Sequence, residues 1–220
     1  MPLFTANHKF WWCCCPPGYV NYQVYSHVFR SAPLQDIPNW QDEVIVVNDH
    51  LKLHSVNEAF SEALYDLVVR NKAALQKAMD WPKQVKSVED TRKTLQGNYL
   101  LHHRGYAKMF MILQQDRLIG VLSFNQIEPS NKTAYIGYWL DEAWQGKGLL
   151  SQALQAFIAR YADSGEVRRF VIKCRVANEA SNRVALRNGF RLEGTLKEAE
   201  YLNGQFYDQN IYALIVDKRR

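Results

Sequence analysis

A glycine-containing turn between a predicted strand and a predicted helix has the residues to bind an anion. The strand is YIGYWL (135–140), the turn is QGKG (145–148), and the helix begins near Leu149. The N–H groups of a helix's first turn lack intrahelical partners and stand at the positive end of the helix dipole. Gly146 and Gly148 allow a ligand to approach that backbone closely, which suits a pyrophosphate. An ordinary tight turn is the alternative that this spacing alone leaves open.

Two glutamates near the end of the chain are candidates for a general base. Glu198 and Glu200 flank Ala199 in a segment that reads as extended, so we expect both carboxylates on one face of a strand and Ala199 on the other. A carboxylate that faces a binding site can accept a proton from an amine, directly or through water. The alternative is a solvated glutamate beside the hairpin that Asn203-Gly204 predicts.

The elements that must position these residues begin with two short strands and two helices. EVIVV and LKLHSV are read as the strands. The apolar spacing of residues 58–79 predicts one long helix, which Trp81-Pro82 ends. A second helix is expected over residues 87–103, because Ser87 and Asp90 have the spacing of a capping box.

The second half of the chain alternates strands and helices. AKMFMIL and RLIGVLSFNQI predict a hairpin with its polar tip at residues 114–116, and TAYIGYWL adds another strand. A helix is expected from Gly148 to about Ala162, followed by the buried strand RRFVIKCRV and a short helix over residues 180–188. Two strands around Asn203-Gly204 complete a mixed α/β order.

The composition and the cysteine spacing favour one domain without a metal site. The chain has 220 residues, of which 47% are hydrophobic, and a net charge of +5, which is too small for the basic surface of a typical nucleic-acid binder. Three of the four cysteines are adjacent at residues 13–15, and Cys174 stands alone, so the spaced pairs of a zinc site are missing. No apolar run has the length of a membrane span, and we expect a soluble, cytoplasmic protein.

Residues 1–40 read differently from the rest of the chain. The string FWWCCCPPGYVNYQVY mixes aromatic residues, prolines and cysteines without a helical or alternating period. It also lacks the ordered basic, apolar and small-residue regions of a signal peptide. We expect residues 1–40 to be a poorly ordered extension, or the result of a start codon assigned too early, and residues 41–220 to form the catalytic domain.

The motifs together resemble the Gcn5-related N-acetyltransferase (GNAT) superfamily. Its acetyl-CoA signature is (Gln or Arg)-x-x-Gly-x-(Gly or Ala), and Gln145, Gly148 and Leu150 occupy the three defined positions, with Leu150 departing from the small residue. The string NEASNRVALRNGF (178–190) resembles the superfamily's helix on the pantetheine side. The resemblance narrows to the branch that acetylates the N-terminal amines of ribosomal proteins and covers about residues 43–217. It rests on NKAALQKAMDWP, TRKTLQGNYLLHHRGYAKM, GVLSFNQIEP, AYIGYWLDEAWQGKG and EYLNGQFYD.

The resemblance implies a GNAT fold and an acyl transfer reaction. The fold is a mixed, mostly antiparallel central sheet with flanking helices and a splayed strand pair that holds acetyl-CoA. The reaction is direct attack on the thioester by the N-terminal serine amine of ribosomal protein L7/L12. An α-amine, with a pKa of about 8 against about 10.4 for lysine, is the easier of the two to deprotonate at neutral pH.

The resemblance also implies the roles of individual residues. Glu200 would accept the proton of the amine, and Ser181 would protonate the leaving thiolate, because Ala185 stands where many relatives have a tyrosine. Water, or a purely capping role for Ser181, is the alternative. The backbone N–H groups of Trp139 and Leu140 would polarise the thioester carbonyl or bind the pantetheine amides. The implied cofactor-binding residues are Trp139, Leu140, Gln145, Gly146, Lys147, Gly148, Leu149, Leu150, Asn178 and Asn182.

Several alternatives stay open at this point. Asn178 and Asn182 stand where helix caps are common, and Asp80 and Trp81, the expected lining of the peptide entrance, would otherwise be a plain helix terminus. A GNAT enzyme that acetylates a polyamine or an aminoglycoside fits the turn equally well, as does a non-catalytic acyl-CoA-binding module. The family further suggests a homodimer, with no direct contact to nucleic acid or membrane.

Overall fold

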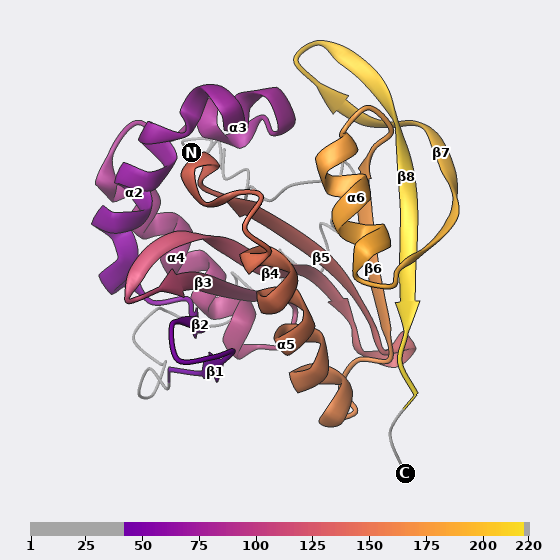
Figure 1. Ribbon diagram of the computed structural model, residues 1–220. Coiled ribbons are helices and arrows are strands. Elements are labelled where there is room, and N and C mark those ends of the chain that lie inside the picture. Colours follow the sequence, from indigo (N-terminus) through magenta and orange to yellow (C-terminus); the bar gives the residue numbers. More distant parts are fainter. Residues whose placement is uncertain (1–41, 218–220) are drawn as a thin grey trace, which may run out of the picture.

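The computed structural model describes residues 42–217 (Figure 1), and the predictions for residues 1–40 lie outside this range. In the described range the strands are β1 Val44–Val46, β2 Leu51–Ser55, β3 Lys108–Gln114, β4 Arg117–Glu128, β5 Thr133–Leu140, β6 Arg169–Arg175, β7 Arg191–Leu202 and β8 Gln205–Ile215. The helices are α2 Ser61–Arg70, α3 Lys72–Ala78, α4 Val88–His103, α5 Leu149–Asp163 and α6 Glu179–Arg187. Short 3-10 turns are η2 Glu58–Phe60, η3 Trp81–Lys83, η4 Pro129–Asn131 and η5 Glu142–Trp144.

The strands form one sheet in the order β1-β2-β3-β4-β5-β6-β8-β7. Every neighbouring pair is antiparallel except β5 and β6, which run parallel and are joined through α5. The predicted mixed, mostly antiparallel sheet with flanking helices is confirmed.

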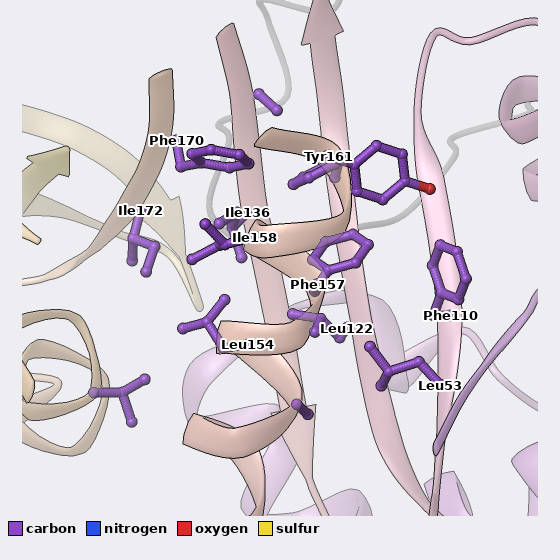
Figure 2. Close-up of a cluster of buried hydrophobic side chains, with 14 of the residues drawn as sticks. Leu53, Phe110, Leu122, Ile136, Leu154, Phe157, Ile158, Tyr161, Phe170 and Ile172 are labelled. Atoms are coloured by element: carbon purple, nitrogen blue, oxygen red, sulfur yellow. The ribbon is translucent and has the colours of Figure 1, made fainter. Parts of the chain in front are cut away.

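Helices cover both faces of the sheet, and each face has its own core (Figure 1). α5 and α6 pack on one face through Leu154, Phe157 and Ala185, whereas α2, α3 and α4 pack on the other. Strand residues alternate between the two cores: Phe110 of β3 belongs to the first and Met111 to the second. Figure 2 shows the first core, in which the ring of Phe157 lies 5.4 Å from that of Phe110.

The prediction of one long helix over residues 58–79 is wrong, because the segment forms η2, α2 and α3, and Asn71 separates α2 from α3. The Asn71 side-chain amide donates to the Leu67 carbonyl at 2.9 Å, and its Oδ1 accepts from the Glu142 backbone N–H at 3.1 Å. This contact with a residue 71 positions away supports the break. The helical spacing of apolar residues along one segment carries no information about such a distant partner.

The remaining helix predictions agree with the structure. Ser87 caps α4, and the reciprocal bonds between Ser87 and Asp90 make a full capping box. α3 ends before Trp81-Pro82, which form η3. In the described part of the chain, none of the helices combines the length and the apolar content that a membrane crossing requires.

Candidate functional site

The strands β5 and β6 separate halfway along their length. They pair in parallel only where residues 133–136 face residues 169–172, although β5 continues to Leu140 and β6 to Arg175. We call residues 137–140 and 173–175 the splayed ends. Their separation confirms the predicted splayed pair and places backbone groups of β5 beside a space that a neighbouring strand does not fill.

The register of β5 decides which of its amides face that space. Trp139 lies opposite Val121 of β4, and the Asp141 N–H donates to the Ile119 carbonyl at 2.8 Å. In an antiparallel ladder these alternate residues point their backbone groups at the same partner, so the Trp139 N–H faces β4. The prediction for Trp139 is corrected: the amides of Leu140 and Tyr138 face β6 instead.

The turn after β5 leads into α5 through two glycines in the left-handed region. Gly146 has φ 73° and Gly148, the N-cap of α5, has φ 75°. A Cβ added at Gly146 would meet no atom within 4 Å, so a ligand has access to this backbone. Gln145 donates from its side chain to the Leu140 carbonyl at 2.9 Å, and Lys147 lies over the Trp144 ring at 4.7 Å.

Leu150 departs from the superfamily signature without displacing the start of α5, since the helix begins at Leu149. Leu149 and Leu150 are both partly buried and pack against the first core. Their side chains therefore anchor the helix, and the backbone amides of its first turn are the groups left to bind an anion.

Asp141 ties this turn to α2. Its side chain is 4% exposed and accepts from the Ala143 N–H at 3.3 Å and from Arg70 at 2.7 Å. Asn71, one residue further along, accepts from Glu142. The break between α2 and α3 therefore positions the turn between β5 and α5.

Ser181 does not cap α6, so that alternative is wrong. Asn178 is the N-cap, and its Oδ1 accepts from the Ser181 N–H at 3.2 Å. The Ser181 hydroxyl instead lies 2.8 Å from the hydroxyl of Tyr138, which comes from the splayed end of β5. The capping alternative for Asn178 is confirmed, and its contact with a cofactor stays a prediction.

Asn182 is occupied by contacts within the protein. Its side-chain amide donates to the carbonyls of Arg175 and Asn178 at 3.0 and 2.7 Å, and its Oδ1 accepts from Asn210 and from the Tyr212 hydroxyl at 2.8 and 2.6 Å. Asn182 therefore joins α6 to β6 and β8, and its predicted contact with pantetheine would have to replace one of these bonds.

Glu200 is a buried carboxylate with two polar neighbours. It is 7% exposed on β7, accepts from the Gln209 amide at 3.0 Å, and lies 3.8 Å from the Arg175 Nε. Burial raises the pKa of Glu200 above its usual value, while the hydrogen bond from Gln209 and the charge of Arg175 act in the opposite direction. A carboxylate with a raised pKa is the stronger proton acceptor.

The expectation that Glu198 and Glu200 share a face is wrong. The pairing of β7 with β8 shifts register between Leu196 and Glu200, and Glu198 adopts the left-handed region with φ 49°. Glu198 is exposed, and its N–H donates to the Asp208 carboxylate at 2.9 Å. The bulge breaks the alternation on which the expectation depended.

The two residues of the predicted entrance have different surroundings. Trp81 is 9% exposed, with its ring centroid 6.2 Å from that of Trp139. Asp80 is exposed and pairs with Lys83, which also donates to Asn203 at the tip of the β7–β8 hairpin. Segment 80–83 therefore contacts both a splayed end and the hairpin, and its role in substrate binding stays a prediction.

The sequence patterns did not predict three polar residues of this region: Tyr138, Arg175 and Gln209. Each becomes visible through a partner on another element, namely Ser181 for Tyr138 and Glu200 for the other two. A local signal exists only for Tyr138 and Arg175, which stand at the ends of predicted strands.

The arrangement unites four chemical features. The splayed ends offer inward-facing amides, the start of α5 offers donors for a phosphate, Glu200 offers a buried base, and the Ser181–Tyr138 pair offers a proton. Within the described residues, His, Cys, Asp and Glu form no group of three that could hold a metal ion.

Comparisons with known proteins agree with this geometry. The sequence model of the acetyltransferase (GNAT) domain matches residues 50–191. The chain is 62% identical over 177 residues to the ribosomal-protein-serine acetyltransferase of Escherichia coli (strain K12), a match that covers 80% of this chain and 99% of that protein.

Two solved structures share the fold. One is a ribosomal L7/L12 alpha-N-protein acetyltransferase in complex with coenzyme A, with a TM-score of 0.79 and 58% identity over 80% of this chain and 100% of that one. The other is the microcin C7 self-immunity acetyltransferase in complex with acetyl-CoA and AMP, with a TM-score of 0.76 and 44% identity over 77% of this chain and 94% of that one. Because the family model matches well over half of the sequence, the chain belongs to the GNAT family of acetyltransferases.

Proposed function

We propose that this chain transfers the acetyl group of acetyl-CoA to the N-terminal serine of ribosomal protein L7/L12. The observation that carries the substrate assignment is the 62% identity to the Escherichia coli ribosomal-protein-serine acetyltransferase over 99% of that protein's length. The buried carboxylate of Glu200 on the hairpin beside the splayed ends supports the acyl transfer itself.

Acetyl-CoA fits the groups present around the splayed ends. The amides at the start of α5, reached past Gly146 and Gly148, would bind the pyrophosphate, with Gln145, Lys147, Leu149 and Leu150 shaping the turn. The Leu140 N–H would bind the thioester oxygen or the pantetheine arm. In the solved complex of the L7/L12 acetyltransferase, coenzyme A forms a disulfide with a cysteine of that protein. In this chain Cys174 lies buried in the splayed end of β6.

Proton transfer would run through two separate groups. Glu200 accepts the proton that the α-amine must lose before it attacks the thioester carbonyl, and then releases it to solvent. The nitrogen loses a second proton to water as the tetrahedral intermediate collapses and the carbon–sulfur bond breaks. The leaving thiolate takes the proton of the Ser181 hydroxyl, and the Tyr138 hydroxyl at 2.8 Å replaces it. The phenol of Tyr138 is then reprotonated by water.

Removing either hydroxyl of this pair is expected to slow turnover. Ser181→Ala and Tyr138→Phe should each lower kcat, Ser181→Ala by about 10²-fold, the lower end of what a positioned acid supplies. Because the two groups act in series, the double variant should be no slower than the slower single variant. Steady-state rates at saturating acetyl-CoA measure both effects.

Exposed residues of the same types serve as controls for this pair. Ser130→Ala and Tyr106→Phe should keep the rate of the parent protein. Losses that multiply in the double variant would show that Ser181 and Tyr138 act independently and would rule out the relay.

A direct assay tests the substrate. The chain is incubated with acetyl-CoA and L7/L12, and intact-mass spectrometry is expected to show a gain of one acetyl group on the N-terminal serine. L7/L12 with a blocked N-terminus is the matched control and should gain none. If the free N-terminus also stays unmodified while the chain binds acetyl-CoA, the substrate assignment fails.

A small-molecule amine is the second candidate substrate. The microcin C7 self-immunity acetyltransferase, 44% identical to this chain, was solved with acetyl-CoA and AMP. Thiol release measured with an aminoacyl nucleotide, a polyamine and an aminoglycoside alongside L7/L12 separates the two classes. A cytoplasmic location, a homodimer, the absence of nucleic-acid and membrane contacts, and a catalytic domain over residues 41–220 stay predictions.

A further inference from the structure

Arg175 connects three elements around the candidate base. It is the last residue of β6, and its Nε lies 3.8 Å from the Glu200 carboxylate of β7. Its guanidinium carbon lies 5.0 Å from the centre of the Tyr207 ring on β8, and its Nη2 donates to the carbonyl of Lys77 in α3 at 2.5 Å. The side chain is only 15% exposed.

Among residues 42–217, Arg175 is the positive charge that acts on Glu200. The groups around it are Gln209, which is neutral, Tyr207, which lies opposite Glu200 in the β7–β8 ladder, and Arg175. Burial alone would favour the protonated acid and so remove the base at neutral pH. The arginine and the glutamine are the groups that oppose this effect.

We propose that Arg175 is a positioning residue of the reaction, which keeps Glu200 an oriented carboxylate and holds the β7–β8 hairpin against α3. This inference rests on the proposed role of Glu200 as the base. Arg175 touches none of the reacting atoms in the proposed mechanism and acts through the carboxylate and through the two elements that flank it.

The shape of the guanidinium explains why arginine stands at this position. Its central carbon lies over the Tyr207 ring, one nitrogen lies near Glu200, and another donates to the Lys77 carbonyl. A lysine ammonium supplies one point of charge on a flexible stem and cannot make the three contacts together. Charge and geometry can therefore be separated by substitution.

The test is the pH dependence of kcat/KM for the acceptor in Arg175→Gln and Arg175→Lys. Arg175→Gln removes the charge, so the acid limb of the profile should move to higher pH. At pH values below this limb, kcat/KM should fall roughly tenfold for each pH unit by which the limb moves. The loss should be larger in mild acid than in mild alkali, where only the lost contacts with Tyr207 and Lys77 lower the rate. Arg175→Lys keeps the charge, so its acid limb should stay in place while kcat falls.

Three results would overturn the inference. One is an Arg175→Gln profile that drops by the same factor at every pH, as a purely structural role predicts. The second is an Arg175→Lys protein with the parent kcat, which decides the case even if Arg175→Gln does not fold. The third is an Arg175→Gln profile whose acid limb moves to lower pH.

Two controls separate this inference from the proposed function. Arg169→Gln removes a charge from the same strand at its fully paired end, where Arg169 pairs with Glu193, and should leave the acid limb unmoved. If Glu200→Gln alone keeps the parent rate, the base role fails, whatever the Arg175 variants show.

Discussion

Glu200→Gln is expected to lower kcat by about 10²- to 10⁴-fold, the contribution of a positioned general base, with unchanged affinity for acetyl-CoA. Gln keeps the size of the side chain and can still accept from the Gln209 amide, so the loss isolates proton acceptance. Stopped-flow single turnovers measure the rate, and calorimetric titration measures the affinity.

Glu198→Gln is the matched control, because Glu198 lies two residues away on the same strand and is exposed. It should retain the parent rate. Equal losses in the two variants, or a full rate in Glu200→Gln, would exclude Glu200 as the base. A parent protein that binds acetyl-CoA without any turnover would instead be a non-catalytic acyl-CoA-binding module.

The stability of Glu200→Gln provides an independent check on the raised pKa. Burial raises the pKa of Glu200, so its contribution to folding is complete below the unfolded pKa and is lost as pH rises through the folded pKa. The Gln variant does not ionise. Its melting temperature relative to the parent is therefore expected to increase from acid to neutral pH, and a decrease would contradict the assigned direction.

Gly120→Ala is expected to give the largest loss of stability among the conservative substitutions considered. A Cβ at this position of β4 would stand 2.4 Å from the Trp139 carbonyl oxygen and 3.0 Å from the Leu140 Cα. Both neighbours are backbone atoms, so the strands must separate. We expect the free energy of unfolding to fall by about 3 kcal/mol, the upper end of usual overpacking costs. Urea unfolding measures it.

The same substitution should weaken acetyl-CoA binding, because the displaced residue Leu140 presents its N–H to the splayed ends. Gly194→Ala in β7 is the control, since a Cβ there meets no atom within 4 Å. It should alter neither stability nor affinity by a measurable amount. A Gly120→Ala protein as stable as the parent would mean that β4 and β5 can separate at this contact without a loss of stability, which would contradict the prediction.

Local residue patterns determined much of this architecture. The hairpin of β3 and β4, the capping box of α4 and the glycine turn before α5 all match the structure, because each depends on residues within a few positions of one another. The matched strings together with the signature around Gln145 and Gly148 also indicated the family, whose sequence model matches residues 50–191.

The predictions were wrong where a contact with a distant residue outweighs the local spacing of apolar and polar residues. The break at Asn71 depends on its hydrogen bond to Glu142, and the outward position of Glu198 depends on a register shift against β8. The direction of the Trp139 amide depends on its pairing with Val121. In each case the deciding contact joins segments that the sequence keeps apart.

The sequence by itself determined that an anion-binding turn, a carboxylate and a serine belong to one acetyltransferase domain. Only the tertiary structure decided that Glu200 rather than Glu198 is buried beside Arg175, and that Ser181 meets Tyr138. The physical reason is that burial and hydrogen bonding depend on how β5, β6, α6 and the β7–β8 hairpin pack together. Residue types and spacing specify each element, whereas the register between elements sets the chemistry of the site.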